Sequence, residues 1–330
     1  MNDDLSAAGP PPRYLPEFPI AGPPPVTPPP PGTPPPGELE QQGEPADRWT
    51  WWQAALAFFG GFFVSQVMVL LLGALWMLVS GMKFDALNDD SSFILVASAL
   101  NELVFIAAAF WIARMTGPAS LRDFGLRRSR FWPTVGKMAI VLFAYFLMLA
   151  IYNAIVNLAP DDAPDKLGAG DSNTHMLFFA LLVAVLAPIA EEFFFRGFVF
   201  RALRNAMGVV AAAIVSGLLF GAMHIDSTST DRLLQVIPLA VLGVSFALLY
   251  NWSGTLYAPI ALHATNNAIA VAAYADKHNS DFGMVLAVVI WLGMMAFCAL
   301  GWRFTDRAEE PPPPGISGTG GGPVEYALPR

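Results

Sequence analysis

A succession of long apolar segments constrains the fold of this chain more than any other feature. Eight segments are long enough, or nearly so, to cross ~30 Å of hydrocarbon at ~1.5 Å per helical residue. They run near 52–80, 92–115, 134–157, 175–203, 208–224, 233–250, 255–275 and 283–302, and the fifth and sixth are short. Backbone groups inside a bilayer must be hydrogen-bonded within the protein. We therefore expect an all-α fold, a polytopic membrane helix bundle of about eight transmembrane helices.

The composition indicates a membrane protein rather than a soluble one. Hydrophobic residues make up 55% of the 330 residues and charged residues 13%, whereas soluble domains carry about 25% charged residues. No basic stripe along the sequence suggests a nucleic-acid partner. The lipid bilayer is the first partner that the sequence implies.

The two ends of the chain differ from this apolar region. Residues 1–48 contain four runs of consecutive prolines, and residues 303–330 contain a proline run at 311–314 and a glycine run at 320–322. Proline runs favour extended polyproline II conformations and do not form packed helices or sheets. We expect a disordered tail over 1–48, a transmembrane helical domain over 49–302 and a second disordered tail over 303–330. The first tail is either a linker or a docking site for a partner through a P-x-x-P motif.

The signs of the loop charges predict the orientation in the membrane. Arginines occupy the links after the second and fourth segments and the C-terminal flank, whereas aspartates occupy the alternate links. The arginines are Arg122, Arg127, Arg128, Arg130, Arg201, Arg204, Arg303 and Arg307, and the aspartates include Asp85, Asp89, Asp90, Asp161, Asp162, Asp165, Asp276 and Asp281. By the positive-inside rule, the arginine-bearing links and both termini lie in the cytoplasm. In a bacterium the membrane would be the inner (plasma) membrane.

Charged groups inside a spanning segment are costly, so the few present here are functional candidates. The fourth segment contains Glu191, Glu192 and Arg196. Glu192 and Arg196 are four residues apart on one helix face, so they are expected to neutralise each other. Adjacent helical residues point about 100° apart, which leaves Glu191 without a partner in its own helix. A lone buried carboxyl group is a typical general base or acid, and the alternative for all three residues is a polar network that only fixes helix packing.

Further polar residues lie in other segments at a similar depth. His224 ends the fifth segment, and His263 and Asn267 are four residues apart on one face of the seventh. An imidazole and a carboxamide arranged in this way suit the stabilisation of an oxyanion. Counting from the expected helix ends places Glu191, His224 and His263 roughly 15–24 Å into the membrane. Glu102 in the second segment is expected either to support this site or to make an independent packing contact.

Three short motifs on three separate segments resemble those of a known family. They are E-E-x-x-x-R at Glu191–Arg196, F-x-x-x-H at Phe220–His224 and H-x-x-x-N at His263–Asn267. Their order is similar to that in the CPBP family, which comprises the type II CAAX-prenyl endopeptidases and the bacteriocin-processing (Abi) membrane proteins. The matching stretch, about 175–275, is a CPBP-like catalytic core covering roughly a third of the chain.

The resemblance implies a membrane-embedded protease, a CAAX-type hydrolase acting on a membrane-associated peptide or protein. It implies catalytic roles for Glu191, His224, His263 and Asn267, with Glu192 and Arg196 in support. In this interpretation Glu191 deprotonates a water that His224 helps to hold, and His263 and Asn267 stabilise the oxyanion. One alternative is a non-enzymatic immunity or scaffold protein of the same family. Another is an ion or proton transporter using Glu102, Glu191 and His224 as a relay, which the lack of an evident inverted repeat disfavours.

Metal dependence is left open by the sequence. Members of the family are often called metalloproteases, and Glu191, His224 and His263 could ligate one zinc ion if a metal is bound. The general base would then have to come from elsewhere, and Glu192 points about 100° away from Glu191. The spacing also differs from H-E-x-x-H, in which two histidines and the base share one helix. The residues therefore favour metal-free catalysis over a zinc site.

Overall fold

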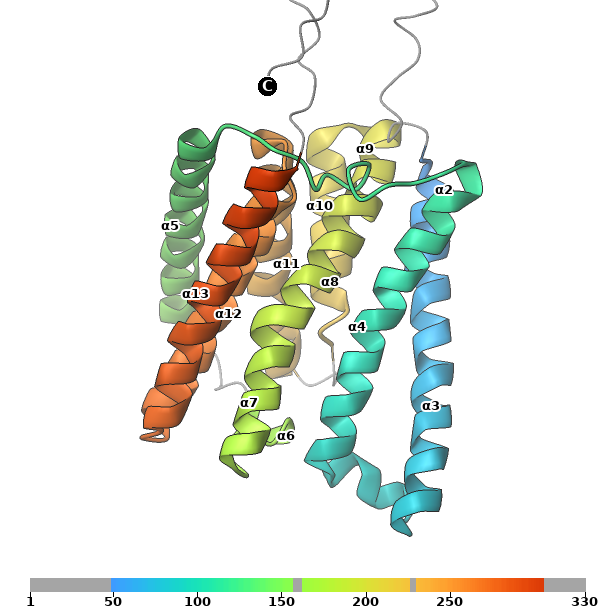
Figure 1. Ribbon diagram of the computed structural model, residues 1–330, viewed down its shortest axis with the longest axis vertical. Coiled ribbons are helices and arrows are strands. Elements are labelled where there is room, and N and C mark those ends of the chain that lie inside the picture. Colours follow the sequence, from blue (N-terminus) through green and yellow to red (C-terminus); the bar gives the residue numbers. More distant parts are fainter. Residues whose placement is uncertain (1–48, 157–161, 226–229, 306–330) are drawn as a thin grey trace, which may run out of the picture. The chain divides into compact units, whose positions relative to one another are not determined.

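The computed structural model describes residues 49–156, 162–225 and 230–305 (Figure 1). Within these ranges the chain is helical and contains no β-strand. The proline-rich tail and all but the first three residues of the C-terminal tail lie outside the described residues, so their disorder stays a prediction. The last helix continues to Phe304, two residues beyond the expected end of the transmembrane domain.

Each of the eight apolar segments corresponds to a helical stretch. The stretches are α2 (Trp51–Ala55), the π-helical turn η2 (Leu56–Gly60) and α3 (Gly61–Ser80); α4 (Ser91–Ala113); α5 (Phe131–Val156); α7 (Asn173–Leu181), η5 (Leu182–Leu186), α8 (Ala187–Glu192), η6 (Phe193–Val199) and α9 (Phe200–Met207); α10 (Val209–Ala222); α11 (Thr230–Ser253); α12 (Tyr257–Lys277); and α13 (Asp281–Phe304). Short 3-10 turns at Phe84–Asp89 and Arg114–Thr116 and the short helix α6 (Ala163–Lys166) lie in the links.

Six of these stretches in the described part of the chain are long and apolar enough to cross a membrane. The other two are α10, which has 14 residues, and α12, which carries His263, Asn266 and Asn267. The prediction of an all-helical, multi-pass membrane protein is therefore confirmed. Length and composition support six of the eight expected spans, because α10 is short and α12 is polar.

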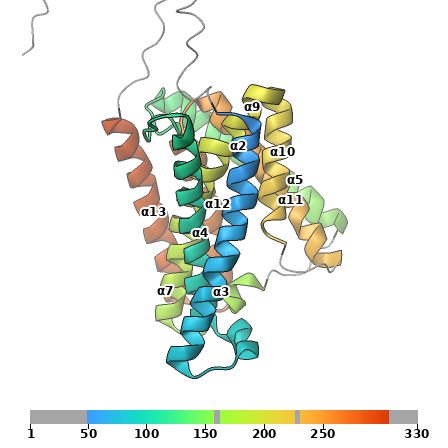
Figure 2. The ribbon, with the colours of Figure 1, turned by 90° about the vertical axis from the view of Figure 1, so that its right-hand side faces the viewer.

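Neighbouring helices pack as antiparallel pairs around the stretch from α7 to α9. The helix α3 packs along α4, α10 along α11, and α12 along α13 (Figures 1 and 2). The central stretch contacts α4 through α8 and η6, and it contacts α12 through η5 and α8. The glutamate pair at the end of α8 therefore lies where α4, α8 and α12 meet.

Small residues allow α10 and α11 to approach closely. A Cβ atom added at Gly217 would lie 2.5 Å from Cγ2 of Val244 and 2.6 Å from the Val244 backbone nitrogen. Gly243 faces the same contact, because its added Cβ would lie 2.9 Å from the Cα atom of Gly217. Close backbone approach through small residues is a common device for packing helices in membranes. Here it fixes the position of the Gly243 carbonyl, which the buried site uses.

Candidate active site

The helical stretch that carries both glutamates contains two π-helical turns, η5 and η6. In the π pattern each N–H donates to the carbonyl five residues earlier, and the N–H of Ala187 donates to Leu182 in this way. The next donor would be residue 188, which is a proline and has no N–H. The carbonyl of Val183 instead accepts a 2.7 Å hydrogen bond from Nδ2 of Asn267 on α12. Asn267 therefore supplies the donor that Pro188 lacks and fixes α12 to the helix bearing the glutamates.

Glu192 connects two helices through one carboxylate oxygen. Its Oε1 accepts a 2.9 Å hydrogen bond from Nη1 of Arg196, as the four-residue spacing predicts. The same oxygen accepts a 2.9 Å hydrogen bond from Nδ1 of His263 on α12. The sequence predicts the pairing of Glu192 with Arg196, and the structure adds that Glu192 also orients the histidine. Sequence spacing reveals contacts within a helix, whereas this second contact depends on the packing of α8 against α12.

The Arg196 guanidinium is completely buried and held on several sides. Its Nη2 donates a 2.9 Å hydrogen bond to the carbonyl oxygen of Gly243 on α11. Its central carbon lies 4.6 Å from the ring centroid of Phe220, 5.1 Å from that of Phe246 and 5.6 Å from that of Phe195. Aromatic faces attract a cation, most strongly when water is excluded. Phe220, the first residue of the F-x-x-x-H motif, therefore helps to hold the buried cation.

His263 lies between the two adjacent glutamates. Its Nε2 is 3.7 Å from Oε2 of Glu191, while its Nδ1 is bonded to Glu192. A carboxylate only accepts hydrogen bonds, so Nδ1 carries a proton and Nε2 is the atom that faces Glu191. If the ring is doubly protonated, the charges of Glu191, Glu192, Arg196 and His263 sum to zero. A neutral cluster of this kind suits a region that excludes water.

A polar cavity of about 170 Å³ lies between α4, α8, η6 and the end of α10. Its lining residues are Ser98, Asn101, Glu102, Phe105, Glu191, Phe194, Phe195, Met223 and His224. The space is large enough for several water molecules, and the polar side chains offer them hydrogen-bond partners. Carboxyl groups from two helices therefore face one cavity together with an imidazole.

His224 lies in the turn after α10 rather than within the helix. The helix ends at Ala222, so the expectation that His224 ends the fifth helix is off by half a turn. Its Nδ1 is 2.9 Å from the carbonyl oxygen of Phe220. A carbonyl oxygen accepts only, so Nδ1 carries the proton and Nε2 is an acceptor in the neutral ring. His224 can therefore accept a hydrogen bond from a water molecule in the cavity.

The predicted site residues separate into three groups in the structure. Glu102, Glu191 and His224 line the cavity. His263 does not line the cavity: its Nε2 lies 3.7 Å from Oε2 of Glu191, and its Nδ1 is bonded to Glu192. Asn267 is engaged elsewhere, because its Nδ2 donates to Val183 and its Oδ1 accepts from Asn266 at 3.0 Å. His263 and Asn267 share one helix, yet they serve different partners, which the four-residue spacing does not reveal.

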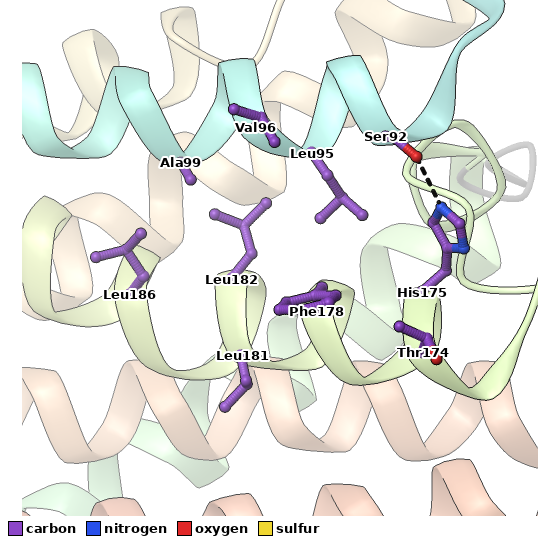
Figure 3. A pocket seen from close by; sticks show the side chains of 10 residues that line it. All are labelled: Ser92, Leu95, Val96, Ala99, Thr174, His175, Phe178, Leu181, Leu182 and Leu186. Atoms are coloured by element: carbon purple, nitrogen blue, oxygen red, sulfur yellow. Dashed lines mark hydrogen bonds between the residues drawn. The ribbon is translucent and has the colours of Figure 1, made fainter.

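An apolar groove lies between α4 and the stretch from α7 to η5. Its volume is about 460 Å³, and it is lined by Ser92, Leu95, Val96, Ala99, Thr174, His175, Phe178, Leu181, Leu182 and Leu186 (Figure 3). At one end Nε2 of His175 lies 3.1 Å from Oγ of Ser92. At the other end the groove reaches Ala99, whose neighbour in the chain, Ser98, lines the cavity. The groove and the cavity are therefore both lined in part by residues of α4.

The donor set does not fit a zinc site as it is arranged. Among the residues that the structure describes, no three histidine, cysteine, aspartate or glutamate side chains are grouped to hold a metal ion. Nδ1 of His263 is bonded to Glu192, and Nδ1 of His224 to a backbone carbonyl. These bonds leave Nε2 of each ring available, so a zinc site is disfavoured because Glu191, His224 and His263 are not grouped around one point.

Comparison with known protein families identifies the segment that contains the motifs. Residues 173–269 match the family described as Rce1-like, the type II CAAX prenyl endopeptidases. The chain carries an Rce1-like domain. This match confirms the resemblance expected from the three motifs. The Rce1-like domain begins with α7 and ends two residues after Asn267, so it contains every motif residue and excludes Glu102.

Individual relatives match different shares of the chain. An uncharacterized 24.3 kDa protein of Escherichia coli is 29% identical over 162 residues, which cover 48% of this chain and 69% of that protein. The membrane-embedded CAAX protease MroQ of Staphylococcus aureus is 32% identical over 100 residues, which cover 28% of this chain and 38% of MroQ. An uncharacterized protein of Mycoplasma capricolum is 27% identical over 237 residues, 67% of this chain and 68% of that protein. No solved structure matches the chain significantly. With its apolar helices and its Rce1-like domain, the chain is an integral membrane protein.

Proposed function

We propose that this protein is an intramembrane endopeptidase that hydrolyses a peptide bond of a membrane-associated protein or peptide. The observation that carries the proposal is the cavity shared by Glu191 and His224. Both residues line the cavity, and Oε2 of Glu191 is buried without a hydrogen-bond partner among the described residues. A carboxylate held in this way, next to a second acceptor and with room for water, is suited to act as a general base.

In the proposed reaction, Glu191 and Nε2 of His224 each accept a hydrogen bond from one water molecule. A water that donates both of its hydrogens keeps its lone pairs free to attack a carbonyl carbon. Glu191 then takes one of these protons as the new carbon–oxygen bond forms. The backbone carbonyl of Phe220 holds the tautomer of His224 that this arrangement needs.

The oxyanion that forms needs hydrogen-bond donors, and His263 is the first candidate. With Nδ1 bonded to Glu192, a doubly protonated ring presents the Nε2 hydrogen on the side of Glu191. Arg196 balances the charge of Glu192, so the ion pair that holds His263 is neutral. Asn267 keeps a second amide hydrogen, which we assign as the other donor, while the first one holds Val183.

We assign the groove in Figure 3 to the binding of an apolar part of the proposed substrate. It lies between two spans, its lining is mostly apolar, and it includes Ala99, which follows the cavity residue Ser98 in the chain. An apolar segment of a membrane-associated substrate matches this lining better than a charged soluble peptide does. The name of MroQ describes a membrane-embedded CAAX protease, and we extend this class of hydrolase to the present chain.

We also propose that the end of the bundle bearing the arginines faces the cytoplasm. The link between α4 and α5, the end of α9 and the end of α13 lie at the same end of the helices (Figure 1). This shared position supports the cytoplasmic location of both termini that the positive-inside rule predicts. The proline-rich tail would then be available for a docking partner on the same side.

The test compares membranes that contain the wild-type protein with membranes that contain Glu191→Gln. The substitution removes the base and keeps the shape of the side chain. Quantitative proteomics of membrane peptides should show shortened products only with the wild type. Asp85→Asn is the matched control, because it makes the same carboxylate-to-amide change at an exposed position between α3 and α4. Identical peptide profiles for the wild type and Glu191→Gln would contradict the proposal.

A further inference from the structure

A second carboxyl group shares the cavity with Glu191. Glu102 lies on α4, which packs against α8 and η6. Its Oε2 is buried and, like Oε2 of Glu191, has no hydrogen-bond partner among the described residues. Glu102 and Glu191 both line the cavity of about 170 Å³. Two unpartnered carboxyl groups that face the same small cavity call for an explanation.

The surrounding charges indicate which of the two groups holds a proton. Of the residues that line the cavity, only His224 can become a cation, and Arg196 is already engaged by Glu192 and Gly243. The cluster of Glu191, Glu192, Arg196 and His263 is neutral when each member is ionised. An ionised Glu102 would add an uncompensated negative charge beside Glu191. Two carboxylates that share a small, poorly solvated cavity cannot both be ionised at low cost. His263 lies beside Glu191, so the proton is assigned to Glu102.

We propose that Glu102 is the general acid that protonates the leaving amine, and therefore a second catalytic carboxyl group of this site. The proposal rests on the endopeptidase function proposed above. Glu102 lies outside the segment 173–269 that matches the Rce1-like family. Its assignment therefore comes from the position of α4 against α8 and not from the family match.

The proton transfers balance over one turnover. The water oxygen attacks the carbonyl carbon, the carbonyl π electrons move to oxygen, and Glu191 takes a proton from the water. The tetrahedral intermediate then re-forms its carbonyl, the carbon–nitrogen bond breaks, and the electron pair on nitrogen takes the proton of Glu102. The products are a carboxylic acid and an amine, with Glu191 protonated and Glu102 ionised. The cavity of about 170 Å³ has room for water that returns the proton from Glu191 to Glu102.

The first experiment needs no substrate and uses the purified full-length protein in lipid. Infrared spectroscopy at neutral pH should show the carbonyl band of a protonated carboxyl group in the wild type. The band should persist in the Asp85→Asn control and be lost in Glu102→Gln. Absence of the band from the wild type, or its survival in Glu102→Gln, would overturn the assignment.

The second experiment uses kinetics on a fluorogenic peptide that spans a bond cleaved by the wild type but not by Glu191→Gln. Glu102→Gln should lower kcat by about 100-fold or more with little change in KM, and the alkaline limb of the pH profile should disappear. An ester at the same position has a leaving group that needs less protonation, so the loss should be much smaller for the ester. Glu102→Asp should retain the alkaline limb.

The outcomes separate the two proposals. Full activity of Glu191→Gln would contradict the proposed endopeptidase mechanism. If Glu191→Gln is inactive while Glu102→Gln keeps its kcat and pH profile, the role of Glu102 is rejected and the endopeptidase mechanism stands. Equal losses of Glu102→Gln on the peptide and on the ester would show a structural role and would also reject the general acid. If Glu102→Gln does not fold, the pH profile of Glu102→Asp and the infrared band of the wild type decide the question.

Discussion

Nδ1 of His263 donates a 2.9 Å hydrogen bond to Oε1 of Glu192, across 71 residues of sequence. The same oxygen binds Arg196, so one buried carboxylate joins the imidazole of α12 to the guanidinium of η6. Glu191, the preceding residue, faces the cavity on the side of α4. Two adjacent glutamates therefore have different surroundings, because successive side chains on a helix point about 100° apart.

The first prediction concerns the contribution of Glu192 to the stability of the fold. Glu192→Ala leaves Arg196 buried without its counter-ion and His263 without its acceptor, and removing one partner of a buried ion pair costs about 3–5 kcal/mol. We expect a large fall in the thermal stability of the protein in detergent. A charge exchange, Glu192→Arg with Arg196→Glu, should not restore stability, because it places a cation against His263. Unchanged thermal unfolding of Glu192→Ala would contradict the prediction.

The second prediction separates two roles of Asn267. Asn267→Ala leaves the carbonyl of Val183 without a donor, and an unsatisfied buried group costs about 1–3 kcal/mol. Pro188→Ala returns an N–H to the position five residues after Val183. The double variant should therefore recover most of the stability measured by thermal unfolding. Its activity should stay low if Asn267 also donates to the oxyanion, and full recovery of activity would limit Asn267 to holding the helix.

The sequence predicts the long helices of this protein well, because each of the eight apolar segments corresponds to a helical stretch. It also predicts the pairing of Glu192 with Arg196, which follows from a four-residue spacing. The contact of Glu192 with His263 and that of Asn267 with Val183 join distant helices, and periodicity within one helix carries no information about them. The π-helical turns were missed as well, although Pro188 in an apolar segment is a signal that the hydrogen-bond pattern changes there. The carbonyl of Val183 accepts from Asn267 because α12 packs against this stretch, and the sequence does not show that packing.

The third prediction concerns the close contact between α10 and α11. Gly217→Ala places a methyl group against the backbone of Val244, so the helices must separate. Overpacking of this kind costs about 1–3 kcal/mol. It should also displace the Gly243 carbonyl that accepts from Arg196. Gly136→Ala on α5 is the control, since its added Cβ meets nothing within 4 Å. The temperature of thermal unfolding should fall for Gly217→Ala and not for Gly136→Ala. Equal unfolding temperatures of the two variants would show that the close approach is not required.

The fourth prediction concerns orientation. The link that contains Ala163 follows α5 and should lie outside the cytoplasm, whereas the C-terminus should lie inside. Reporter fusions after Ala163 and after Arg330 should therefore give opposite signals. Reporters on the same side would show that the chain crosses the membrane an even number of times between these points. In that case α10 or α12, the two helices that lack the length or apolarity of a span, would be the first to reassign.

The last prediction concerns metal removal. The histidines that would serve as ligands have their Nδ1 atoms bonded to Glu192 and to the Phe220 carbonyl, and Nε2 of His263 faces Glu191 at 3.7 Å. Binding zinc through His263 would bring the ion against the carboxylate that the proposed mechanism uses as the base. Among the residues that line the cavity, only Glu102 could then act as the base. We therefore expect the purified, active protein to contain less than one zinc ion per chain and to keep its activity after chelation. Metal analysis and activity measured on the same sample before and after chelation test this expectation. Stoichiometric zinc that is lost together with activity, and that restores activity when it is returned, would decide for a metal-dependent reaction and would make Glu102 the candidate base.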